Sequence, residues 1–139
     1  NSDMKKSVAT DESVADYNFF GSAVLSLAEN EDIEPYMEKL REINLQSLEV
    51  TIIGLLPTQT IITMSLSVSG VGTLCTQTNI TSINNTFTPE IDANLLEEAG
   101  QKLVDDGLVT VTISGTATGQ VANTVTLVFK SKVTAGALD

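Results

Sequence analysis

The sequence predicts a mainly β fold, an antiparallel two-sheet β-sandwich of about six strands with two short helices. Apolar and hydroxyl residues alternate over several segments, most clearly over Thr60–Ser69, and such alternation is typical of an antiparallel sheet with one buried face. No charged residue occurs from Val50 to Pro89, where fourteen Ser and Thr are found. Because Thr is β-branched and fits a pleated surface, this composition also favours strands. A length of 139 residues fits one domain with one core.

The chain divides at about residue 18 by composition. Residues 1–18 are rich in Asp, Ser, Lys and Asn and predict a flexible polar N-terminal tether, whereas residues 19–139 form the predicted sandwich domain. Such a polar N-terminal segment is typical of the tether that follows a cleaved signal peptide or a lipid-modified cysteine. An ordinary frayed terminus explains it nearly as well.

The first elements of the domain are a strand and a helix. Periodicity allows a strand or a helix over Phe19–Ala28, and we favour a strand. A helix is predicted over residues 32–42, where Asp32 can cap the first turn and Pro35 is tolerated. The apolar residues with helical spacing are Ile33, Tyr36, Met37 and Leu40.

Three strands follow, over Leu45–Leu55, Thr60–Ser69 and Thr73–Ile83. Pro57 marks the first turn, and Gly70 and Gly72 mark the second. The residues expected to face the core are Leu48, Val50 and Ile52 in the first strand, and Ile62, Met64, Leu66 and Val68 in the second.

A second helix and two strands complete the chain. Thr88-Pro89 predicts the helix start and Gly107 its end. Its apolar stripe consists of Ile91, Leu95, Leu96, Ala99, Leu103 and Val104. The last two strands are predicted over Leu108–Ala117 and Val121–Val133. The residues expected to face the core are Val109, Val111 and Ile113 in the first of them, and Val125, Leu127 and Phe129 in the second. Lys130 and Lys132 would discourage edge-to-edge pairing. The helices are expected to close an end or an open side of the sandwich.

Charge excludes several partners. The formal net charge is −11, with only seven Lys and Arg. Nucleic-acid binding requires clustered basic residues, so we expect no nucleic-acid partner. Attraction to an anionic membrane surface is excluded for the same reason.

The residue types needed for most catalysis are missing. The chain has no histidine, which removes Ser-His-Asp chemistry and the usual transition-metal ligands. Cys75 is the single cysteine, and we expect it to be a small buried hydrophobe. The uncharged strands contain no carboxylate to line a cleft, as a glycosidase requires. We therefore expect no enzyme, and assign no catalytic residue, cofactor or metal site.

Weaker motifs each have a simpler explanation. Asp105-Asp106 with Glu97 and Glu98, and the cluster Glu29–Glu34, could supply oxygens to Ca²⁺, but acidic residues at helix ends and caps are ordinary. The aromatics Tyr17, Phe19, Phe20 and Tyr36 could bind a glycan, although a small core at the N-terminal edge is the simpler account. Asn79-Ile80-Thr81 and Asn84-Asn85-Thr86 match the glycosylation pattern. Gly115 and Gly119 are expected in a turn.

The pattern as a whole resembles a known group of proteins. "TIITMSLSVSG", the helix after "TFTPE", and "LVTVTISGTATG" with "VTLVFKSKVTA" are similar to envelope lipoproteins of Bacteroidetes-type bacteria, which have immunoglobulin-like domains. The outline is also similar to the sandwich of late-embryogenesis-abundant type proteins. Neither resemblance supplies functional residues.

Two functions remain open. The resemblance and composition imply a non-catalytic, exported or lipid-tethered envelope domain that contacts another envelope protein through exposed strand edges. The alternative is a module that binds a small ligand or glycan, with a cavity lined by residues such as Met64, Leu66, Leu96 and Leu103.

Overall fold

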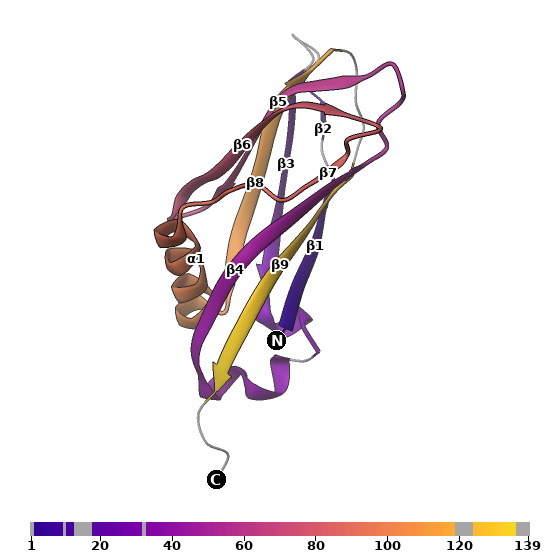
Figure 1. The fold of residues 1–139 in the computed structure, drawn as a ribbon. Helices are drawn as coiled ribbons and strands as arrows, with labels where there is room; N and C mark the ends of the chain where they lie inside the picture. Colours follow the sequence, from indigo (N-terminus) through magenta and orange to yellow (C-terminus); the bar gives the residue numbers. More distant parts are fainter. Residues whose placement is uncertain (1, 10, 13–17, 32, 119–123, 136–139) are drawn as a thin grey trace.

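The computed structural model describes residues 2–9, 11–12, 18–31, 33–118 and 124–135 (Figure 1). The strands within them are β1 (Ser2–Ala9), β2 (Asp11–Glu12), β3 (Asn18–Ser26), β4 (Leu40–Ile53), β5 (Thr60–Val68), β6 (Gly72–Thr81), β7 (Thr86–Phe87), β8 (Leu108–Ala117) and β9 (Thr124–Ala135). Two 3₁₀ helices, η1 (Leu27–Glu29) and η2 (Glu34–Lys39), and one α-helix, α1 (Ala93–Asp106), complete the described elements.

The strands form two antiparallel sheets. Sheet A has the order β1-β9-β4-β7, and sheet B has the order β2-β3-β8-β5-β6. The prediction of a mainly β fold with two antiparallel sheets is confirmed. The expected number of about six strands was too low, since the described residues contain nine, of which β2 and β7 have two residues each.

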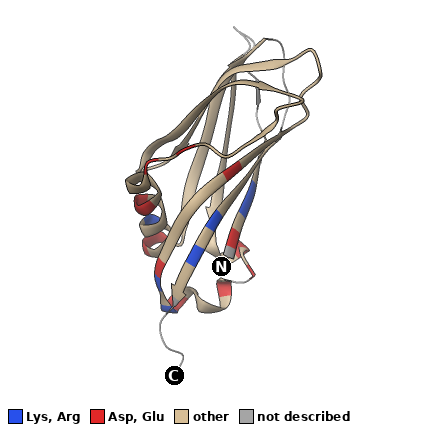
Figure 2. Cartoon of the chain, in the orientation of Figure 1, with Lys and Arg blue, Asp and Glu red and all other residues tan. Residues whose placement is uncertain are grey.

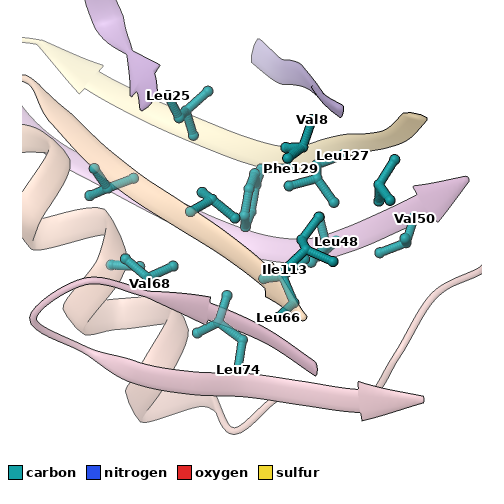
Figure 3. Packing of buried hydrophobic residues seen from close by; sticks show 14 of the residues in the cluster. Val8, Leu25, Leu48, Val50, Leu66, Val68, Leu74, Ile113, Leu127 and Phe129 are labelled. Atoms are coloured by element: carbon teal, nitrogen blue, oxygen red, sulfur yellow. The ribbon is translucent and has the colours of Figure 1, made fainter. Parts of the chain in front are cut away.

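The inner faces of both sheets supply one hydrophobic cluster (Figure 3). Strand alternation places side chains on that face at every second position, as predicted for β8, β9 and the second half of β4. Fully or almost fully buried members include Leu48, Val50, Ile52, Val109, Val111, Ile113, Val125, Leu127 and Phe129.

The N-terminal tether is replaced by a strand over part of its length. β1 pairs with β9 from Ser2 to Ala9, and its Met4 and Val8 are buried in the core. Asp3 and Lys5, on either side of Met4, are exposed, so these two charges lie on the wet face. The expectation of an unpaired segment over residues 1–18 is therefore corrected for β1 and β2. Residues 10 and 13–17 lie outside the described residues.

A bulge overturns one predicted core residue in β5. The pairing of β5 with β8 shifts register between Ile61 and Thr63. An extra residue in a strand reverses the alternation beyond it. Ile61 is consequently buried, and Ile62, which strict alternation placed in the core, is 46% exposed. Met64, Leu66 and Val68 are buried as predicted.

The helix predicted over residues 32–42 is wrong in type and length. The structure has a six-residue 3₁₀ helix, Glu34–Lys39, and β4 begins at Leu40. Ile33 occupies the cap position and makes no side-chain cap hydrogen bond, while Asp32 lies outside the described residues. Of the apolar stripe only Ile33 is buried, whereas Tyr36 is exposed. Residues 40–42 belong to a strand and not to the predicted helix, because β4 pairs with β9 from Leu40 onward.

Helix α1 begins later than predicted. Its cap is Asp92, whose carboxylate accepts a hydrogen bond from the Asn94 amide at 2.8 Å, so Thr88-Pro89 precedes the helix. Gly107 ends it with φ of +77°, as predicted. Gly100 is required for packing, because a Cβ there would collide with the Ile43 carbonyl oxygen of β4. The helix packs on β4 of sheet A and on β8 and β6 of sheet B.

The expected role of Lys130 is also corrected. β9 pairs with β1 on one side and β4 on the other, so it is an inner strand of sheet A. Lys130 faces Asp3 of β1 and Ser47 of β4 in the register. It therefore does not protect an edge, because the N-terminal strand takes that place.

Candidate functional site

The edges of the two sheets differ in chemistry. β1 has no pairing partner beyond it among the described residues, and Asp3, Lys5 and Lys6 place charges along it. β6, likewise without an outer partner in the described part of the chain, contains no charged residue over Gly72–Thr81. Charged side chains on an edge strand, especially Lys, discourage pairing with another chain. The β6 edge lacks this protection.

The free edge of β6 is polar but neutral. Thr73, Thr76 and Thr78 are exposed, whereas Leu74 and Ile80 are buried in the core. Six of its residues, Cys75–Thr78, Ile80 and Thr81, pair with β5 in one register, because the register shift lies before them, between Leu66 and Ser67. The edge therefore offers a regular stretch of strand backbone from Cys75 to Thr78. Asn79 interrupts its regularity with φ of +55°.

Cys75 lies on this strand opposite Leu66. It is partly buried and packs against the core, so the expectation of a small buried hydrophobe holds in part. Burial raises the pKa of the Cys75 thiol to about 11. The thiol is therefore protonated at neutral pH, which makes it a poor nucleophile.

The outer face of sheet B carries hydroxyls in register. Across β3, β8, β5 and β6, one row is Ser22, Thr112, Ser67 and Thr73. The adjacent row is Phe20, Ser114, Ser65 and Thr76. Side-chain hydrogen bonds join neighbours within these rows, with Ser65–Thr76 at 3.0 Å and Ser67–Thr73 at 3.2 Å.

A groove of about 600 Å³ lies between the first half of β4 and the start of α1. Ile43, Leu45 and Leu96 supply apolar lining, and Glu42 and Glu97 are at its rim. Of the four residues predicted to line a ligand cavity, only Leu96 reaches this groove. The other three, Met64, Leu66 and Leu103, are at most 2% exposed in the core.

Several carboxylates of the acidic clusters interact with side chains of the protein itself. Gln101 donates a hydrogen bond to Asp105 at 2.9 Å, and Lys102 forms an ion pair with Asp106 at 3.0 Å. Glu29 of the Glu29–Glu34 cluster pairs with Lys6 at 3.1 Å. Among the residues that the structure describes, no group of three His, Cys, Asp or Glu side chains could hold a metal ion.

The predicted aromatic cluster is not formed by the described residues. Phe19 is 2% exposed, whereas its neighbour Phe20 is 56% exposed on the opposite face of β3, as alternation requires. Tyr36 is exposed on η2, which follows the far end of β3. Tyr17 lies outside the described residues.

The structure also shows where the Asn-x-Thr sequences and Gly115 lie. Asn79 and Asn84 are both exposed, on β6 and in the turn after it. Gly115 belongs to β8 and not to a turn, so that expectation is corrected; Gly119 lies outside the described residues. A Cβ at Gly115 would collide with the Thr63 carbonyl oxygen and the Phe19 ring, which explains the glycine.

Sequence reasoning missed the asymmetry between the edges and the groove beside α1. Both depend on which strands end a sheet, and alternation within one strand carries no information about that. The absence of charge in β6 was visible in the sequence, and it becomes informative only once β6 is known to be an edge.

Among the described residues, no helix combines the length and apolar character needed to span a membrane.

Comparisons with known proteins give only distant likenesses. No protein-family model matches the chain, and no curated protein sequence matches it. A chain of turnip yellow mosaic virus is similar over 99% of this chain and 84% of its own length, with 16% identity and a TM-score of 0.42. A chain of desmodium yellow mottle tymovirus is similar over 99% and 90%, with 13% identity and a TM-score of 0.39.

A third likeness is to TmCBM61, solved in complex with β-1,4-galactotriose. It extends over 94% of this chain and 69% of the other, with 15% identity and a TM-score of 0.37. At these TM-scores none of the three likenesses carries an argument about function.

Proposed function

We propose that this chain is a non-catalytic domain of the cell envelope, exported or tethered by a lipid, that binds another envelope protein along β6. In this proposal the two sheets form an immunoglobulin-like β-sandwich, since their inner faces share one hydrophobic cluster. The envelope assignment is supported by wet strand faces of Ser and Thr without charge, and by the resemblance to Bacteroidetes-type lipoproteins.

The observation that carries the proposal is the uncharged edge of β6. An extended segment of a partner can add to this edge through main-chain hydrogen bonds, as in other β-augmentation complexes. A partner strand there would meet Thr hydroxyls and no fixed charge, so it need not desolvate an ionised group. The β1 edge, by contrast, would bring Asp3, Lys5 and Lys6 against the partner.

The test is crosslinking of the tagged full-length protein in the cells that express it, followed by fractionation and mass spectrometry. The decisive variant is Thr78→Lys, which places a charge in the middle of the β6 edge. Its matched control is Ser7→Lys, at an exposed position of the β1 edge. We expect one defined set of envelope proteins to be recovered with the natural chain and with the control, and lost with Thr78→Lys. Recovery from the cytosolic fraction without an enriched partner would contradict both the compartment and the function.

A second candidate function is binding of a small apolar or glycan ligand in the groove between β4 and α1. The observation in its favour is the volume of about 600 Å³, which falls within the range of small-molecule sites. A ligand bound there should raise Tm in a thermal-shift screen. Ala93→Trp, at an exposed position of the lining, should abolish that rise if this groove is the site.

A further inference from the structure

One end of the molecule carries exposed apolar side chains on two neighbouring loops and at the strand ends beside them. Ile83 is 88% exposed, Leu56 is 58% exposed and Ile53 is 55% exposed. Ile62, turned outward by the β5 bulge, is 46% exposed. We call these four residues the apolar tip. It lies at the end opposite η1 and η2 (Figure 1).

Hydrogen bonds tie the turn after β6 to the end of β4, next to the loop between β4 and β5. The Ile52 amide donates to the Asn85 carbonyl oxygen at 2.8 Å, and the Asn85 side-chain amide donates back to the Ile52 carbonyl oxygen at 3.0 Å. Within the first loop, the Leu56 amide donates to the Gln59 side chain at 2.9 Å. The apolar tip is therefore presented on a fixed backbone.

Charge is segregated away from the apolar tip. The whole stretch from Val50 to Pro89, which contains all four residues, has no Asp, Glu, Lys or Arg. Most described charges lie on the other half of the molecule, around α1, η2 and the nearby strand ends (Figure 2). The acidic strand β2 belongs to sheet B as well, but β3 and β8 separate it from β5.

The size of the apolar tip and the net charge of the chain indicate which kind of partner the tip can bind. A stable protein–protein interface buries at least about 1,200 Å² in total, and four side chains at one end of the molecule supply too little for one, which argues against a second copy. A bilayer surface, by contrast, accepts a few apolar side chains by shallow insertion. A net charge of −11 opposes binding to anionic lipids. We propose that the apolar tip inserts reversibly into the interface of a bilayer with zwitterionic headgroups.

This inference is independent of the β6 edge and is tested separately. The full chain is mixed with phosphatidylcholine vesicles and the bound fraction is measured by flotation. Ile83→Asp replaces the most exposed apolar residue with a charge, and should lower the partition coefficient at least about tenfold. Leu108→Asp is the matched control, since Leu108 is 44% exposed at the opposite end, beside α1, and it should leave binding unchanged. Circular dichroism melting checks that both variants fold.

Four results would overturn the proposal. These are no flotation of the natural chain, equal flotation of Ile83→Asp, equal loss in Leu108→Asp, and tighter binding to phosphatidylglycerol vesicles than to phosphatidylcholine. A dimer in solution that Ile83→Asp abolishes, without vesicle binding, would assign the tip to a second copy instead.

Discussion

The outer faces of the two sheets meet water with different chemistry. On sheet A, Lys130 of β9 lies between Asp3 of β1 and Ser47 of β4, and its ammonium pairs with the Asp3 carboxylate at 3.4 Å. On sheet B, the corresponding positions of β8, β5 and β6 hold Ser and Thr, and hydroxyls of β5 bond to hydroxyls of β6 across the strands. The inner faces, however, are alike, and both consist mostly of aliphatic and aromatic residues, with Ser131 of β9 also buried.

This difference shows that charge is not needed to keep a sheet face wet. A hydroxyl satisfies its hydrogen bonds with water or with a neighbour, and carries no charge that would repel a similar surface. Sheet A is thereby protected against pairing at its β1 edge, and sheet B is left open to it at β6. The stability of both sheets should depend on the shared inner face, and only weakly on either outer face.

The largest effect is expected from the inner face. Phe129→Ala, at a residue 1% exposed on β9, should lower the free energy of unfolding by about 3–5 kcal/mol, because it leaves a cavity in the common core. Urea denaturation gives the value. Val128→Ala, one position along the same strand and only half-buried, is the control and should cost less than about 1.5 kcal/mol. Similar losses for both variants would contradict the division into inner and outer faces.

An intermediate effect is expected at the margin of the inner face, where Cys75 is partly buried on β6. Burial raises its pKa to about 11. A free cysteine has a pKa of about 8.5, so the thiolate fraction at pH 8 should be at least about a hundredfold lower in the folded chain than in urea. The rate of alkylation by iodoacetamide, followed by mass spectrometry, measures this.

The same pKa fixes the sign of a stability effect. The folded state holds the thiol proton more tightly than the unfolded state does. The resulting stability is fully present below the unfolded pKa and is lost as pH rises through about 11. Equal alkylation rates in the folded and denatured chain would show that the edge strand opens readily.

The smallest effect is expected on the outer faces. Lys130→Ala removes the ion pair with Asp3, in which both side chains are 52% exposed, and should cost at most about 0.5 kcal/mol. That cost should shrink in 1 M NaCl, because salt screens exposed charges. Ser65→Ala on sheet B should cost a similarly small amount, which salt leaves unchanged. A salt-dependent loss in Ser65→Ala would remove the distinction between the two faces.

Local pattern predicted much of this molecule correctly. The strand over Leu108–Ala117 has the predicted bounds, and its inward residues are the predicted ones, because period-2 alternation is a property of the strand itself. Gly107 ends α1 as expected, since only a residue that tolerates positive φ fits there. The predicted helix near residue 36 failed because its apolar spacing is also compatible with a short turn that leads into a long strand.

The candidate sites were less accessible to sequence reasoning. The Thr residues of β6 and the apolar residues Leu56 and Ile83 were visible as residue types, but nothing local showed that β6 is an edge or that the turn after β6 is bonded to β4. The hydrogen bonds between Ile52 and Asn85 join positions far apart in the chain. The groove similarly requires α1 to lie against β4, which Gly100 permits.

The sequence by itself determined the fold class, the inward faces of most strands and the uneven distribution of charge, because these follow from nearest-neighbour geometry and composition. Only the tertiary structure decided that β1 completes sheet A, that β9 lies inside it, and that Ile62 turns outward. Each of these depends on the register between strands that are distant in the chain. Register is fixed by the joint burial of both partners, which no single segment contains.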